Sequence, residues 1–128
     1  MSSASVSVRS YRDLLVWQKS VDLVVVCYTN TQSLPRSETF GLAAQIQRSA
    51  VSVPANIAEG HGRKHLGDYL HHLSIARGSL MELETHLIVA SRLGFIGKLD
   101  LESVLKRTDE ISRMLTGLRK QLEGSRTR

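Results

Sequence analysis

Histidine and carboxylate side chains are the residues of this 128-residue sequence best suited to bind a metal ion, and five histidines are present. His71 and His72 are adjacent, so on a helix their side chains diverge by about 100°. Glu82 and His86 share a helix face, but metal sites in helical bundles use Glu-x-x-His motifs from two helices, with further glutamates. The sequence has neither this spacing nor a second copy. We therefore expect surface histidines, no metal and no cofactor.

The segment from Gly60 to Lys64, Gly-His-Gly-Arg-Lys, has the glycines and cations of a phosphate-binding loop. A P-loop, however, has four residues between its glycines, a Lys-Ser or Lys-Thr pair and a preceding strand, and all three are missing. A helix end followed by a tight turn explains the segment better. Gly60 and Gly62 are then hinge residues, in the left-handed conformation that glycine adopts at low cost. Arg63 and Lys64 are left as a loose site for an anion.

No residue of the sequence has the surroundings of an activated nucleophile. The single cysteine, Cys27, ends an apolar run, and burial there would raise the pKa of its thiol. No Ser-His-Asp or Cys-His arrangement can be assigned. We expect no enzymatic activity, and a lone buried cysteine fits a reducing cytoplasm.

A polar stripe runs along the segment before the glycine hinge. Its members, spaced 3-4-4-3-4, are Gln45, Arg48, Ser52, Asn56, Glu59 and Arg63. Such a stripe is either a solvated face or a hydrogen-bonded interface between helices or subunits. The small residues around it favour an interface. Gly78 in the following segment also predicts a close helix approach, since a glycine in mid-helix costs about 1 kcal/mol against alanine.

Four amphipathic helical patterns position these residues, with apolar side chains at intervals of three and four. They cover residues 11–31, 38–60, 66–93 and 100–123. The third is the most regular, and its seam comprises Leu66, Tyr69, Leu73, Ala76, Leu80, Leu83, Leu87 and Ala90. The seam expected for the first comprises Leu14, Trp17, Val21, Val24 and Tyr28.

Four residues predict how these helices begin, bend and end. Ser37 and Asp100 are expected as N-caps, because their side-chain oxygens accept hydrogen bonds from a first helical turn. Pro54 lies inside the second pattern and predicts a kink rather than a break, since the apolar stripe continues beyond it. Gly94 is expected to end the third helix.

Together the patterns predict an all-α fold, an antiparallel up-down-up-down four-helix bundle with a long central helical hairpin. The bundle covers residues 11–123, with a disordered arm over 1–10 and a frayed tail over 124–128. The arm lacks the apolar segment of a signal peptide. No apolar run approaches the about 20 residues that cross a bilayer. We expect a cytoplasmic protein without a membrane partner.

Several motifs, in order, resemble one known family. They are Glu38–Gln45 (ETFGLAAQ), Arg48–Gly60 (RSAVSVPANIAEG), Leu73–Ser79 (LSIARGS) and Glu82–Glu84 (ELE), with Trp17-Gln18 also fitting. The sequence resembles, over about residues 10–122, the four-helix-bundle proteins encoded by intervening sequences of bacterial large-subunit ribosomal RNA genes. It departs from the family at Gln47, where an arginine is frequent, and at His72, where an aromatic residue is usual.

The resemblance implies a left-handed four-helix bundle that assembles into a ring-like homo-oligomer, a pentamer. Related accessory proteins of diversity-generating retroelements share this architecture and bind nucleic acid through a basic surface. No enzymatic activity is attached to the family. The alternative function is a structural scaffold or protein-interaction module that binds a protein partner and no nucleic acid.

The charge of the chain is compatible with RNA or DNA as a partner. The sequence has 17 Lys and Arg against 12 Asp and Glu, a formal net charge of +5, which permits an anionic partner without requiring one. The candidates for contacting phosphates are Arg48, Arg63, Lys64 and Arg77.

Arg48 has a second interpretation, as part of a structural polar network. In an antiparallel hairpin turning near residues 63–64, facing residue numbers sum to about 127, so Arg48 lies within one turn of Glu82. We expect Arg48 to form an ion pair with Glu82 or Glu84. Asn56 and Glu59, nearer the turn, are expected to hold the hinge together by hydrogen bonds.

Overall fold

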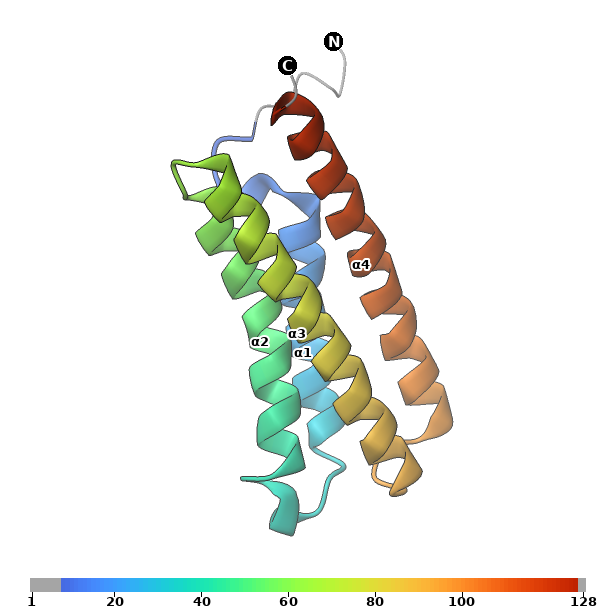
Figure 1. Cartoon of the computed structure of the whole chain (residues 1–128). Coiled ribbons are helices and arrows are strands. Elements are labelled where there is room, and N and C mark those ends of the chain that lie inside the picture. Colours follow the sequence, from blue (N-terminus) through green and yellow to red (C-terminus); the bar gives the residue numbers. More distant parts are fainter. Residues whose placement is uncertain (1–7, 127–128) are drawn as a thin grey trace.

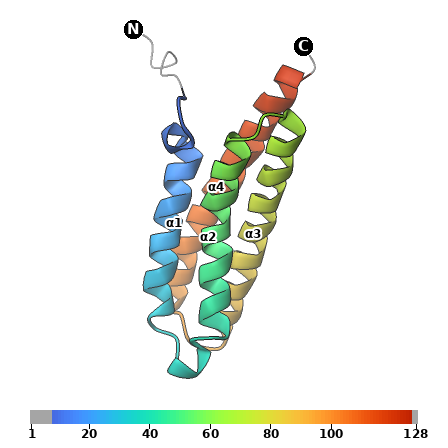
Figure 2. The same ribbon diagram turned by 90° about the vertical axis from the view of Figure 1, so that its left-hand side faces the viewer.

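Four long helices make up most of the computed structural model, which describes residues 8–126 (Figure 1). In chain order the elements are η2 (Tyr11–Asp13), α1 (Leu15–Thr31), η3 (Arg36–Glu38), α2 (Leu42–His61), α3 (Leu66–Arg92) and α4 (Lys98–Arg126). The turn between α2 and α3 lies at one end of the bundle, and the two other connections lie at the opposite end (Figures 1 and 2). Residues 8–126 contain no strand, so the predicted all-α, up-down-up-down bundle is confirmed.

The core is aliphatic and lies between helices that are neighbours around the bundle. Each helix packs against two others, and α2 and α3 form the most extensive of these contacts. The seam predicted for α3 is confirmed over most of its length, because its last six members are buried and only Leu66 and Tyr69 at its start are half-buried; the buried members are Leu73, Ala76, Leu80, Leu83, Leu87 and Ala90. The removal of these apolar side chains from water is the main force that holds the four helices together.

The seam predicted for α1 is correct only in part: Leu14, Trp17 and Val24 pack partly buried against the core, but the fully buried face is rotated by about one residue. The buried residues of α1 are Val16, Ser20, Leu23, Cys27 and Thr31. Tyr28, which the sequence placed in the core, is exposed. Burial of the hydroxyls of Ser20 and Thr31 is tolerated because each donates to a carbonyl of its own helix, of Val16 at 2.6 Å and Tyr28 at 2.8 Å.

The starts of α2 and α4 differ from the predicted caps. Ser37 lies in the η3 turn and is not the N-cap, a position that Gly41 occupies. Glu38 reaches forward instead, and its Oε1 accepts from the backbone N of Leu42 at 3.1 Å. Asp100 lies inside the first turn of α4, which begins at Lys98. Both carboxylates are still placed favourably near the positive end of a helix dipole.

The left-handed backbone conformation predicted for the hinge residues Gly60 and Gly62 is also wrong. Gly62 is the C-cap of α2, with φ −80°. Among residues 8–126 only Gly94 has a positive φ, +83°, where the sequence ended the third helix. Gly60 is instead a point of close contact. A Cβ there would lie 2.9 Å from Cβ of His72 and 3.0 Å from Cδ1 of Tyr69.

The proline inside α2 does not break that helix, and α4 extends beyond its predicted end. The α2 helix continues through Pro54, which is buried, so the proline does not split it. The α4 helix continues to Arg126, past Gly124, where the tail was expected to begin. Most of the expected N-terminal arm, residues 1–7, and the last two residues of the tail lie outside the described residues.

Replacement of Gly60 by alanine tests the close approach of α2 and α3. The new methyl group would overlap His72 and Tyr69, so Gly60→Ala is expected to destabilise the fold by about 1–3 kcal/mol. Gly117→Ala is the matched control, since a Cβ at Gly117 meets nothing within 4 Å and the helix gains up to about 1 kcal/mol. Thermal unfolding followed by circular dichroism measures both. A Gly60→Ala variant as stable as the control would contradict the assignment.

Candidate functional site

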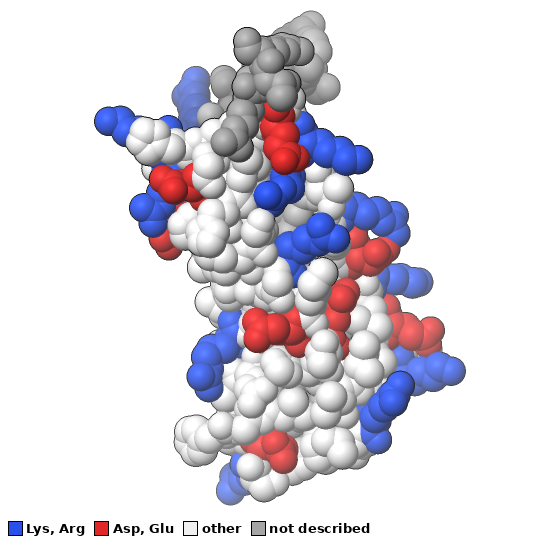
Figure 3. Space-filling view, in the orientation of Figure 1, with Lys and Arg blue, Asp and Glu red and all other residues white. Residues whose placement is uncertain are grey.

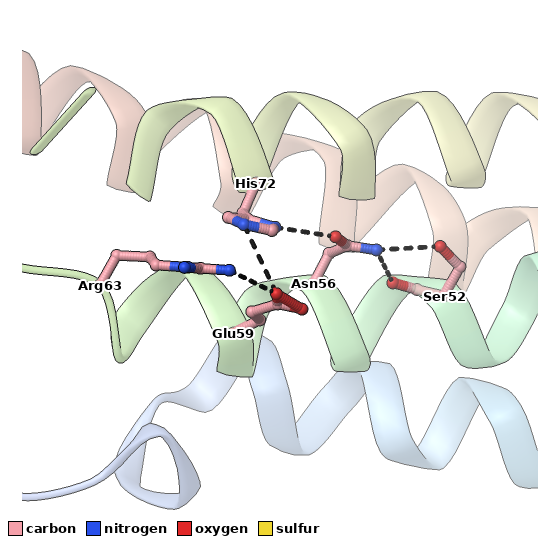
Figure 4. A network of polar contacts seen from close by, with 5 residues as sticks. All are labelled: Ser52, Asn56, Glu59, Arg63 and His72. Atoms are coloured by element: carbon pink, nitrogen blue, oxygen red, sulfur yellow. Dashed lines mark hydrogen bonds and ion pairs between the residues drawn. The ribbon is translucent and has the colours of Figure 1, made fainter. Parts of the chain in front are cut away.

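A polar network joins α2 to α3 beside the turn between them (Figure 4). Asn56 lies at its centre, with Nδ2 donating to the backbone O of Ser52 at 2.9 Å and to its Oγ at 3.0 Å. Oδ1 of Asn56 lies 3.0 Å from Nδ1 of His72 on the facing helix. Glu59 lies one turn further along α2 and forms an ion pair with Arg63 at 2.7 Å.

The geometry of the network fixes the orientation of the His72 ring. Because Nδ2 of Asn56 donates twice to Ser52, Oδ1 of Asn56 is left as the acceptor, so Nδ1 of His72 carries the hydrogen. Nε2 of His72 lies 3.7 Å from Oε2 of Glu59. The structure therefore brings Asn56 and Glu59, both predicted as hinge residues, onto the same histidine. The side chain of His72 is 13% exposed, so the network helps to hold the two helices together.

An open groove of about 560 Å³ lies further along the same pair of helices. It is lined by Phe40, Gln45, Arg48, Ser49, Ser52, Ser79, Glu82 and His86. The hydroxyls of Ser52 and Ser79 meet at 2.7 Å. At the rim the side chain of Phe40 is 95% exposed. Cation, carboxylate, imidazole and phenyl groups thus converge on one open groove.

The predicted ion pair of Arg48 with Glu82 or Glu84 is wrong. Arg48 is exposed, and within residues 8–126 the structure records no ion pair or hydrogen bond of its side chain. Ser49 takes the buried position of this turn, which leaves Arg48 on the outer ridge of α2. Glu84 is directed towards α4, where its Oε2 accepts from Oγ1 of Thr108 at 2.6 Å.

The four basic candidates for phosphate binding do not form one patch. Arg63 is paired with Glu59, and Lys64 beside it is exposed. Arg48 lines the groove between α2 and α3. Arg77 lines a small hollow between α3 and α4. On the face shown in Figure 3, basic and acidic side chains alternate along the edge occupied by α4.

Arg119 is a further basic residue near Arg77 that was not among the candidates predicted from the sequence. It lines the same hollow as Arg77, and its Nη1 donates to Oγ of Ser74 at 2.6 Å and to the backbone O of Leu70 at 3.3 Å. No sequence signal identifies it, because the contact depends on the register between α3 and α4.

Two residues at which the chain departs from the family pattern have contacts in the structure. Nε2 of Gln47 donates to Oγ1 of Thr31 at 3.1 Å, which joins α2 to α1. His72 joins α3 to α2 through Asn56. Both contacts are hydrogen bonds between neighbouring helices.

The single cysteine of the chain is buried in the core. Burial raises the pKa of the Cys27 thiol to about 12, so the thiolate needed for nucleophilic attack is suppressed. Across residues 8–126, no three His, Cys, Asp or Glu side chains come together in a group able to hold a metal ion. None of the helices in this range is both long enough and apolar enough to span a membrane.

Comparison with known proteins gives one family and a solved structural relative. A family model described as 23S rRNA-intervening sequence protein matches residues 12–117. A crystal structure from Bacteroides thetaiotaomicron, described as a protein of unknown function from the S23 ribosomal protein family, is 28% identical in sequence. The two structures superpose with a TM-score of 0.75, over 83% of this chain and 99% of the other. No curated protein matches the sequence. Neither description names an enzymatic activity.

The Asn56 network is expected to contribute to stability more than its exposed ion pair does. Asn56→Ala removes the hydrogen bonds to Ser52 and His72 and should cost about 1–3 kcal/mol, because partly buried partners are left unsatisfied. Arg63→Ala breaks only a solvent-exposed pair and should cost less than about 1 kcal/mol. Urea unfolding curves of the two variants provide the measurement. Equal losses would contradict a central role for Asn56.

Proposed function

The chain belongs to the family of 23S rRNA-intervening sequence proteins, and from this premise we propose that it is a non-enzymatic, homo-oligomeric bundle that binds RNA or DNA through phosphate contacts. The family predicted from the motifs between residues 38 and 84 is thereby confirmed. The proposed assembly is the pentameric ring that the resemblance implies. Its proposed compartment is the cytoplasm.

The observation that supports the proposed assembly is that part of the outer surface of α2 and α3 is left uncovered. This pair forms the most extensive helix contact of the fold, yet its outer side holds an open groove with an almost fully exposed phenyl ring, Phe40, at its rim. The groove lies beside a slim helix whose outer ridge includes Ala44 and Ala55. Small side chains let another helix approach closely, and an exposed aromatic side chain at such a place is typical of a surface that meets a partner.

The proposed nucleic-acid contact rests on exposed basic side chains without carboxylate partners. The chain has a net charge of +5. In the described range, Lys64 and Arg77 form no ion pair, whereas Lys19 and Arg113 are paired with Glu110 and Asp109. Five subunits in a ring would carry about +25, enough for binding that depends on salt rather than sequence.

The chemistry of these groups favours contact with the phosphate backbone over the bases. Lys64 lies in the turn between α2 and α3, whereas Arg77 lies on α3 beside the hollow towards α4, so the two cations are well separated. Recognition of a base edge requires side chains fixed in register within a groove of the nucleic acid. Exposed Lys and Arg side chains instead bind phosphates and release counterions.

The mass of the purified protein tests the assembly directly. Light scattering coupled to gel filtration is expected to give five times the chain mass of 14.2 kDa, because burial of the α2–α3 surface favours a closed ring. A dilution series down to micromolar concentration shows whether the assembly is stable. A species of 14.2 kDa at all concentrations would contradict the proposal.

Salt dependence tests the nucleic-acid contact. Fluorescence anisotropy with a labelled single-stranded RNA and a DNA of the same mixed sequence should show binding that weakens steeply with salt. The double variant Lys64→Ala/Arg77→Ala should bind more weakly and flatten the logarithmic salt slope by about one for each phosphate that is no longer bound.

The matched control is Lys19→Ala/Arg113→Ala, which removes the same formal charge from residues already paired with carboxylates. It is expected to bind nearly as tightly as the wild-type protein. Equal losses of nucleic-acid affinity in the two double variants would show that binding depends on net charge alone. Absence of binding at low salt would overturn this part of the proposal and leave a scaffold that binds a protein.

A further inference from the structure

We propose that a second copy of this chain docks on the outer surface of α2 and α3, and that Arg48 of one subunit forms an ion pair with Glu82 of the partner subunit. We call this surface, made by Phe40, Arg48, Ser52, Gly78 and Glu82, the α2–α3 face. The inference rests on the proposed homo-oligomer and deepens it by naming the contact surface. It also assigns Arg48 to assembly rather than to nucleic acid.

The first argument is the pair of unmatched charges. Arg48 and Glu82 line the same groove, both are exposed, and the structure of residues 8–126 gives neither an ion pair. The surface between α1 and α4 differs, since Lys19 there reaches Glu110 at 3.2 Å. The α2–α3 face therefore holds one cation and one anion that a partner could neutralise.

These charges decide which partner fits. A nucleic acid laid over the groove would bring its phosphates close to the carboxylate of Glu82, which repels them. A second copy presents both signs, so each Arg48 can meet a carboxylate and each Glu82 a guanidinium. In a ring, Arg48 of each subunit then meets Glu82 of one neighbour, while its own Glu82 meets Arg48 of the other neighbour, which is the heterologous type of contact that closes a ring of identical subunits.

The second argument is Gly78, which has no explanation within one subunit. It lies in the middle of α3 and is exposed, and a Cβ built on it meets nothing within 4 Å. A mid-helix glycine destabilises the helix relative to alanine, and no close approach within residues 8–126 accounts for Gly78. Docking of another subunit against the outer side of α3 would account for the glycine, because a missing side chain lets two helix backbones come close.

The third argument is the apolar surface next to the two charges. Phe40 lies at the rim of the groove. Val51, on the other side of the α2 ridge, is 42% exposed and lines a second hollow together with Tyr28 and Arg48. The ridge that holds Arg48 is thus flanked by a mainly polar groove with Phe40 at its rim and by a second hollow with a largely apolar wall. A partner helix that covers the ridge would bury Phe40 and Val51 and remove their contact with water.

Charge reversal tests the proposed ion pair. Arg48→Glu and Glu82→Arg should each raise the concentration at which the assembly dissociates by about tenfold or more, because like charges then face each other. The double variant Arg48→Glu/Glu82→Arg restores opposite charges and should restore the wild-type mass. Light scattering measures the mass of each, and circular dichroism confirms that each variant is folded.

Two further variants distinguish a specific effect on the subunit interface from a general effect of charge or of subunit stability. Arg113→Glu makes the same change of charge on the outer side of α4 and should leave the mass unchanged. Gly78→Gln adds a side chain where the isolated subunit has open space. It should keep or raise the thermal stability of the subunit yet lower the mass of the assembly.

The outcomes distinguish this inference from the proposed assembly itself. An oligomeric wild type whose mass is unaffected by the reversals and by Gly78→Gln would overturn the α2–α3 face and leave the oligomer in place. Reversals that lower the melting temperature, with recovery in the double variant and no change of mass, would place the pair within one subunit. A wild-type protein that is monomeric would overturn both.

Discussion

The close packing of α3 against α2 is the interaction on which the rest of the structure depends. The unbroken apolar seam of α3 is buried along most of its length, and the absence of a side chain at Gly60 lets α2 pack closely against Tyr69 and His72 of α3. Burial of the seam fixes the rotation of α3 about its axis. It thereby decides which polar residues face α2, which face α4 and which face solvent.

Two functional surfaces follow from that rotation. On the side towards α2, the polar residues of both helices form the Asn56 network and the groove that contains Arg48 and Glu82. On the side towards α4, Arg77 lies beside Arg119. A surface with both signs of charge suits contact with another subunit, and Arg77, which has no ion pair within residues 8–126, suits contact with a phosphate backbone. The proposed function assigns one role to each, so that assembly and nucleic-acid binding need not compete for the same residues.

The fold was largely predictable because its signals are local. A buried seam repeats every three or four residues, and the seam of α3 could be read from Leu73 to Ala90 without knowledge of any partner helix. The seam of α1 could not, because Ser20 and Thr31 are buried although they are polar. Their hydroxyls bond to carbonyls of the same helix, which removes the cost of burial that hydrophobicity patterns assume.

The sequence by itself determined the fold class, the family and the residues of the polar stripe, since each depends on residue types at fixed spacing along one chain. Only the tertiary structure decided which stripe residues meet. Glu84 bonds to Thr108 rather than to Arg48, and Arg48 lies on the outer ridge of α2 without an ion pair in the described range. The physical reason is that a contact across helices depends on their relative register and rotation. Those are set by the packing of the whole core, and one residue of rotation moves a charge by about 100° from a buried neighbour to solvent.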